Sequence, residues 1–145
     1  MTVTVHDVAA YILQQHGGAM TSMKLEKLVY YSQAWSLVWD EEPIFAEKIE
    51  AWVNGPVVPE LYARHRGMFK VRKWDGHPER LTPDQKETIN AILGFYGKRS
   101  SMELSQMTHQ EDPWIIARRG LSPSERGSRE ITLASMAEYY GSLVP

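Results

Sequence analysis

The most regular hydrophobic pattern in the chain lies between Thr21 and Trp39. One set of side chains recurs there at three- and four-residue spacing, which places the set on one face of a helix. Its members are Leu25, Leu28, Ser32, Trp35 and Trp39. From Leu28 onward the opposite face is almost as apolar, and only Gln33 and Ser36 on it are polar enough to face water. A helix that is apolar nearly all round sits in the middle of a core, so this stretch predicts a buried central helix.

The first turn of this central helix carries three charged residues, Lys24, Glu26 and Lys27. Charged side chains are rarely buried unless they are paired. We therefore expect this turn, alone in the helix, to lie in water.

Start and stop signals predict further helices around the central one. Thr4, with Asp7 three residues later, is a capping-box pattern for an amphipathic helix that ends before Gly17. We expect this first helix to pack antiparallel to the central helix. Proline or a capping residue ahead of apolar residues at helical spacing predicts five more helices. They begin near Pro59, Thr82, Ser100, Asp112 and Thr132, and residues 121–129 are expected to form a loop.

The hydrophobic period changes after Pro43, which ends the central helix region. Alternation from Ile44 to Val53 predicts a strand, and Asn54 with Gly55 marks a turn. A second, weaker alternation from Phe69 to Trp74 is expected to pair with it. The fold class predicted is mainly α (α+β): a helical bundle around a buried central helix, with a small antiparallel sheet or hairpin. Helix should exceed the average of about a third of the residues.

Composition restricts the classes of function. A chain of 145 residues fits a single domain, residues 1–145, and a formal charge of −2 gives no general attraction to nucleic acid or anionic membrane. There is no cysteine, which excludes disulfides and thiolate zinc sites. The sequence shows no basic region followed by an apolar run at its start and no stretch of ~18 apolar residues, so we expect a cytoplasmic protein without a membrane partner.

One polar cluster has residues that could perform acid–base chemistry: Thr108, His109, Glu111 and Asp112. In an enzyme, His109 would act as a base near the carboxylates. In a structural role, Asp112 would cap a helix starting at Pro113, while Thr108 and His109 bridge backbone groups of the loop. We favour the structural role, because no nucleophile or metal ligand stands at a matching spacing. The sequence shows no phosphate-binding loop and no nucleophile elbow, so no catalytic residue, cofactor or metal is predicted.

Basic residues gather between Arg64 and Lys73, and Trp74 follows them. They could form a strip that binds nucleic acid, a surface for an acidic partner, or the solvated edge of a strand. We favour the strand edge, because lysine and arginine commonly prevent an edge strand from pairing with another chain. Among the tryptophans, Trp35, Trp39 and Trp114 occupy apolar-face positions and are assigned to the core. Trp52 and Trp74 lie in the weaker strand region, where an exposed aromatic ring could anchor a partner.

Three stretches, in order, resemble a known family. They are MKLEKLVYYSQAW (Met23 to Trp35), IEAWVNGPVVPELY (Ile49 to Tyr62) and LSQMTHQEDPW (Leu104 to Trp114). Together they resemble the Panacea or SocA-like domain of bacterial and phage antitoxins, also met in phage-associated GepA-like proteins. The resemblance extends from Asp7 to Tyr140.

This resemblance implies a mainly helical antitoxin that neutralises a protein toxin encoded beside it by direct binding. Members of the SocA type look like protease adaptors that deliver the toxin for degradation, which would add a cellular protease as a partner. The family offers no catalytic residues to transfer. A small enzyme using the cluster at Thr108 to Asp112, and a DNA-binding autoregulator, are the alternatives, although no nucleic-acid partner is expected.

A tight protein complex needs anchors that the chain does not require for its own core. Two places meet this condition: the expected solvated start of the central helix, and the strand region, whose edge could accept a strand from the partner. The predicted partner-binding residues are Lys24, Lys27, Tyr31, Trp52, Arg72 and Trp74.

Overall fold

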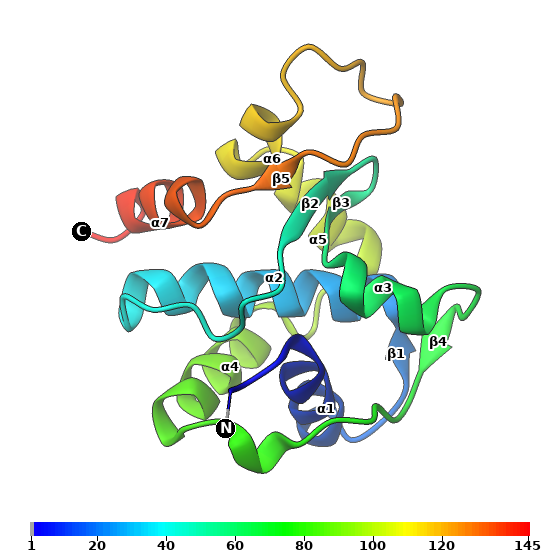
Figure 1. Ribbon diagram of the computed structural model, residues 1–145, viewed down its shortest axis with the longest axis vertical. Helices are drawn as coiled ribbons and strands as arrows, with labels where there is room; N and C mark the ends of the chain where they lie inside the picture. Colours follow the sequence, from blue (N-terminus) through cyan, green and yellow to red (C-terminus); the bar gives the residue numbers. More distant parts are fainter. Residues whose placement is uncertain (1) are drawn as a thin grey trace.

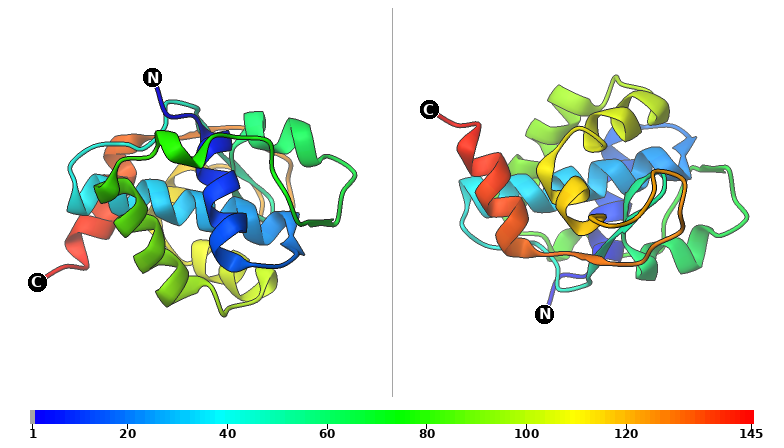
Figure 2. Two further views of the ribbon diagram at one scale, coloured as in Figure 1. Left: turned by 90° about the horizontal axis from the view of Figure 1, so that it is seen from below. Right: turned by 90° about the horizontal axis from the view of Figure 1, so that it is seen from above.

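The computed structural model describes residues 2–145, and the helix α2 (Ser22–Trp39) lies at its centre. The other helices surround α2 (Figures 1 and 2). They are α1 (Val5–His16), α3 (Pro59–His65), α4 (Pro83–Tyr96), α5 (Ser101–Thr108), α6 (Asp112–Ala117) and α7 (Leu133–Ser142), with a short 3-10 helix η1 (Pro78–Arg80). Helix accounts for 54% of the chain, which confirms the mainly helical class.

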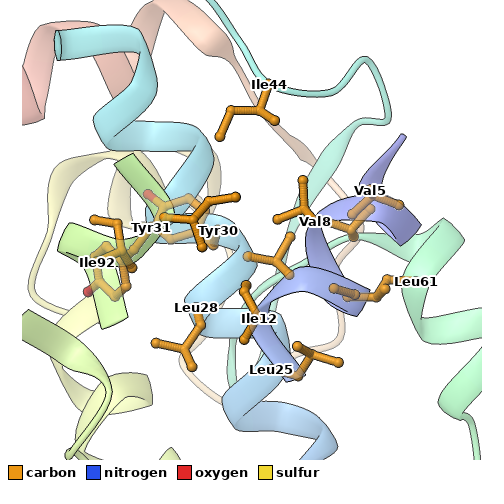
Figure 3. Packing of buried hydrophobic residues seen from close by; sticks show 14 of the residues in the cluster. Val5, Val8, Ile12, Leu25, Leu28, Tyr30, Tyr31, Ile44, Leu61 and Ile92 are labelled. Carbon is orange, nitrogen blue, oxygen red and sulfur yellow. The ribbon is translucent and has the colours of Figure 1, made fainter. Parts of the chain in front are cut away.

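The burial of α2 confirms the central-helix prediction. Leu25, Leu28 and Tyr31 are completely buried, and Tyr30 nearly so. Figure 3 shows these side chains packed among residues of α1, α3 and α4. The hydrophobic faces of the surrounding helices therefore meet on α2, which supplies the middle of a single core.

Two expectations about α2 are wrong. Glu26 and Lys27 are 0% exposed, because β3 and α3 cover the first turn of the helix. Trp39 is 47% exposed, because it is the last residue of α2 and the chain turns away at Asp40. Trp39 stacks on Trp35, with ring centroids 5.1 Å apart, and does not enter the core.

The local start signals form the caps that the sequence predicted. Capping boxes open α1 at Thr4, α4 at Thr82 and α5 at Ser100, and Thr132 caps α7. One cap differs: α6 begins at Asp112 itself, so this residue cannot be its cap. The relation of α1 to α2 also differs from the expectation, since α1 crosses α2 and does not run antiparallel beside it (Figure 2).

The strands form two small antiparallel sheets. A three-stranded sheet has the order β3-β2-β5, from β2 (Ile49–Trp52), β3 (Gly55–Val57) and β5 (Glu130–Ile131). A two-stranded sheet joins β1 (Met20–Thr21) to β4 (Lys70–Val71). The predicted turn is present, but its residues are Val53 and Asn54, and Gly55 is the first residue of β3. The segment from Phe69 to Trp74 pairs with β1 and not with β2. The hairpin partner β3 already occupies one edge of β2 and β5 the other, so β2 has no edge left for β4 or for a partner strand.

A cluster of phenols attaches α7 to α2. The Tyr31 hydroxyl donates to Glu111 Oε1 at 2.7 Å, and the Tyr140 hydroxyl donates to the same oxygen at 2.8 Å. Tyr30 and Tyr140 also share a hydrogen bond between their hydroxyls, at 3.0 Å. Tyr31 stacks in addition on Tyr96 of α4, with ring centroids 4.0 Å apart. Glu111, which lies just before α6, therefore joins two helices far apart in the sequence.

The residue that allows the β2–β3 hairpin to approach the helices is Gly55. Its φ of 120° lies in the region that favours glycine. A Cβ atom here would lie 2.7 Å from Lys27 Cε and 2.9 Å from the Thr108 hydroxyl oxygen. Both neighbours are buried, so neither can move away without disturbing the core.

We predict that Gly55→Ala lowers the free energy of unfolding by about 2 kcal/mol or more, through backbone strain and overpacking. The matched control is Gly94→Ala, in the exposed interior of α4, where an added Cβ meets nothing within 4 Å. This control should stabilise the protein by about 0.5 to 1 kcal/mol. Urea unfolding of both variants measures the difference, and equal stabilities would contradict the close approach at Gly55.

Candidate functional site

The three stretches that suggested a family meet at the β2–β3 hairpin. Lys27, from the first stretch, donates from Nζ to the carbonyl of Pro56 in the second, at 3.0 Å. Trp114, from the third stretch, donates from Nε1 to the carbonyl of Trp52, at 2.8 Å. The hydroxyl of Ser105 in α5 donates to the carbonyl of Asn54. The hairpin is thus fixed by α2 on one side and by α5 and α6 on the other.

Glu26 provides the second buried connection between α2 and the hairpin. Its Oε1 accepts from the backbone N–H of Val58 at 2.9 Å, and its Oε2 lies 2.7 Å from His65 Nε2. Glu26 and His65 are almost completely buried. The Glu26 carboxylate therefore accepts the free backbone N–H just before α3 and contacts His65, the last residue of the same helix.

Lys27 and Pro56 together explain how the outer edge of β3 is closed. Pro56 stands opposite Ala51, a position in a two-residue hairpin where the backbone groups point away from the partner strand. The missing N–H of proline thus costs no hydrogen bond of the sheet. The outward carbonyl is satisfied by Lys27, and burial of this ammonium lowers its pKa to about 8, although the neighbouring Glu26 carboxylate acts in the opposite direction.

His109 and Glu111 belong to different clusters. The His109 ring stacks on Trp114 with centroids 4.1 Å apart, its Nε2 is buried without a hydrogen-bond partner in residues 2–145, and burial lowers its pKa. Burial raises the pKa of Glu111, whose oxygen accepts from two tyrosines. The hydroxyl of Thr108 donates to the carbonyl of Ser105 at 2.7 Å, which is a hydrogen bond within α5. The polar residues of this segment are thus used in packing and loop structure, and no base–carboxylate pair forms at His109 among the residues described.

A groove of about 710 Å³ lies against the exposed side of the hairpin. It is lined by Met23, Trp52, Val53, Asn54, Tyr62, Arg66, Arg126, Gly127 and Ser128. Trp52 and Tyr62 meet edge to face with ring centroids 4.7 Å apart. The lining contains two arginines and no carboxylate. The groove therefore combines partly exposed aromatic rings with positive charge.

The six predicted contact residues do not form one surface. Trp52 lines the groove, and Arg72 is exposed. Lys27 and Tyr31 are completely buried, which removes their side chains from the surface in this conformation. Lys24 is partly buried and donates to the carbonyl of Gly97 at 2.6 Å, at the end of α4. Trp74 donates to His6 Nδ1 at 3.1 Å and is partly buried.

The structure nevertheless links Trp52 to Trp74 through a series of rings. Tyr62 contacts both Trp52 and His65, and His65 contacts Trp74, with centroids 4.7, 5.2 and 6.2 Å apart. Sequence reasoning did not select Tyr62, Arg66 or Arg126 as contact residues. Tyr62 and Arg66 belonged to noted patterns, a family stretch and a basic run. Arg126 lies in an aperiodic loop, and nothing in the sequence places it beside β2.

These features describe a small helical domain with a groove on its surface. Its buried charged residues, Glu26 and Lys27, hold the hairpin and α3 in place. Among residues 2–145, no three His, Asp or Glu residues gather in a way that could hold a metal ion. Within the same range, no helix has the length and hydropathy needed to cross a membrane.

A family model described as antitoxin SocA-like, Panacea domain, matches residues 25–115. This range covers more than half of the chain, and the chain belongs to this family. The match begins in α2 and ends in α6, so it contains the hairpin together with Glu26, Lys27 and Trp114. Comparisons with curated proteins and with solved structures give no match.

The lowered pKa of Lys27 predicts a dependence of stability on pH. Unfolded lysine has a pKa near 10.4, so between pH 8 and about 10 the unfolded chain binds more protons than the folded one and stability rises with pH. Lys27→Met lacks this titration. The free energy of unfolding of the native protein, minus that of Lys27→Met, should therefore increase by about 1 kcal/mol per pH unit between pH 8 and 9.5.

Urea unfolding at pH 7, 8, 9 and 9.5 measures this difference, and the titration of the tyrosines cancels because both proteins share them. Lys98→Met is the control, since Lys98 is exposed, and its profile should run parallel to that of the native protein. Parallel profiles for Lys27→Met as well would show that the Lys27 ammonium keeps its ordinary pKa in the folded state.

Proposed function

We propose that this protein is an antitoxin that neutralises a cognate protein toxin, encoded beside it, by binding the toxin directly. The family match over residues 25–115 is the observation that carries the proposal. The groove supports it, because aromatic and arginine side chains are the residue types that most often anchor protein interfaces. The hairpin beside the groove is fixed on both sides, which lowers the ordering cost of binding.

A binding mechanism without catalysis also agrees with the roles found for the polar residues. His109 packs on Trp114, and Glu111 accepts from two tyrosines. Neither residue lines the groove. A partner that sits on the groove would therefore meet aromatic rings, arginines and turn backbone, and not an acid–base pair.

The direct test is co-expression with the protein encoded beside this chain. We expect that protein to arrest growth when produced alone, co-expression to restore growth, and the two proteins to co-purify. The same experiment in cells lacking their ATP-dependent proteases separates blocking from delivery to a protease. Direct neutralisation persists in those cells, whereas an adaptor would still bind the toxin but no longer rescue growth. Rescue without any complex in either strain would exclude binding as the mechanism.

Catalysis is tested by His109→Ala. We expect this variant to lose the stacking on Trp114, and hence some stability, but to neutralise the toxin as the native protein does as long as it is folded. Thermal unfolding, toxin binding and growth rescue are measured together at a temperature below the melting transition. Loss of rescue with an unchanged melting temperature and unchanged toxin binding would contradict the binding mechanism and indicate chemistry at His109.

A further inference from the structure

Two arginines of the groove have no carboxylate partner. Arg66 follows the end of α3, and Arg126 comes from the loop at residues 121–129. Both are exposed, and within residues 2–145 neither makes a salt bridge or a side-chain hydrogen bond. A guanidinium presents its donors in a planar fork that matches a carboxylate in two-point contact. The groove thus offers two unused sites of this kind from separate segments of the chain.

The aromatic part of the groove offers surface without a free donor on the indole. Trp52 is partly exposed, but its Nε1 already donates to Glu50 Oε1 at 2.9 Å. Beyond Arg66 the chain continues with Met68 and Phe69, which are 50% and 75% exposed. The carbonyl of Phe69 accepts from the N–H of Ser22, so the backbone at Phe69 lies beside the start of α2, where the next residue, Met23, lines the groove. Large exposed apolar side chains in a segment close to a groove are typical of a surface for a protein partner.

The loop that carries Arg126 is held in place. Arg118 is 5% exposed, and its guanidinium donates to the carbonyl of Ala51 in β2 at 3.0 Å. It also donates to the carbonyls of Ser122, at 3.2 Å, and Glu125, and lies over the Trp114 ring. Arg118 is therefore a positioning residue that ties the loop to the hairpin. A groove built this way loses little conformational entropy when it binds.

We propose that this groove binds an acidic segment of the toxin. One or more Asp or Glu carboxylates would pair with Arg66 and Arg126, and an adjacent apolar side chain would pack on Trp52 and Tyr62. The inference rests on the proposed antitoxin function and specifies its contact. Nucleic acid fits less well, because its affinity comes from neutralising many phosphates, whereas the groove lining has two cations and the chain has a net charge of −2.

The first experiment does not require the toxin. A random dodecapeptide phage library is selected on the native protein, and the enriched peptides are synthesised. We expect them to carry Asp or Glu beside an aromatic or aliphatic residue, and to bind Arg66→Glu/Arg126→Glu at least about tenfold more weakly. Lys73→Glu/Lys98→Glu makes the same change of charge at exposed residues outside the groove and should bind like the native protein. Trp52→Ala should weaken binding, while Trp39→Ala, at an exposed tryptophan outside the groove, should not.

The second experiment uses the co-expressed toxin and the same variants, each first shown to be folded by its melting temperature. The arginine double variant should lose co-purification and growth rescue, and the lysine double variant should keep both. If the native protein itself fails to rescue, the antitoxin function is wrong. If rescue by the arginine double variant is intact, the function stands and the groove is not the contact.

Other results would overturn the acidic-segment proposal directly. They are the absence of any enriched peptide, enrichment of basic or uncharged peptides, and equal peptide binding by the arginine and lysine double variants. A fluorescein-labelled 20-nucleotide RNA is the probe for the other class of anion. Binding of this RNA at 150 mM salt that disappears in Arg66→Glu/Arg126→Glu, without selective loss of peptide binding, would assign the groove to nucleic acid.

Discussion

The burial of Glu26 and Lys27 against the backbone of the next segment is the constraint on which the arrangement of this domain depends. Removing two charged groups from water costs several kcal/mol each unless hydrogen bonds replace the lost solvation. Here the Glu26 carboxylate accepts from the N–H of Val58 and contacts the ring of His65, and the Lys27 ammonium donates to the carbonyl of Pro56. Because these partners occur together only where β3 leads into α3, the charges fix that junction on the central helix.

This constraint also shapes the surface that we assign to function. The hairpin held by Lys27 is held again from its other side, where Trp114 and Arg118 donate to carbonyls of β2. Arg118 extends the same arrangement into the loop that carries Arg126. The hairpin and the loop that line the groove are therefore held by buried and partly buried hydrogen bonds. A rigid surface of this kind binds without a large entropic cost.

A second polar network, at Glu111, holds α7 on the central helix. It joins Tyr31 of α2 to Tyr140 of α7, while His109, only two residues before Glu111, faces Trp114 and the hairpin. The segment from Thr108 to Asp112 resembles an acid–base cluster only in the sequence. Its members are neighbours in the sequence, but they serve separate parts of the fold.

The sequence by itself determined the features that depend on local interactions: the central helix, the starts of the other helices, a turn next to Gly55 and the family. Helical periodicity and caps are set by residues within a few positions of one another. Only the tertiary structure decided that Glu26 and Lys27 are buried, that Trp39 is exposed, that β4 pairs with β1, and that Arg66 and Arg126 share a groove. Each of these depends on which distant segment covers a side chain or an edge, and a pattern along one helix or strand carries no information about that segment.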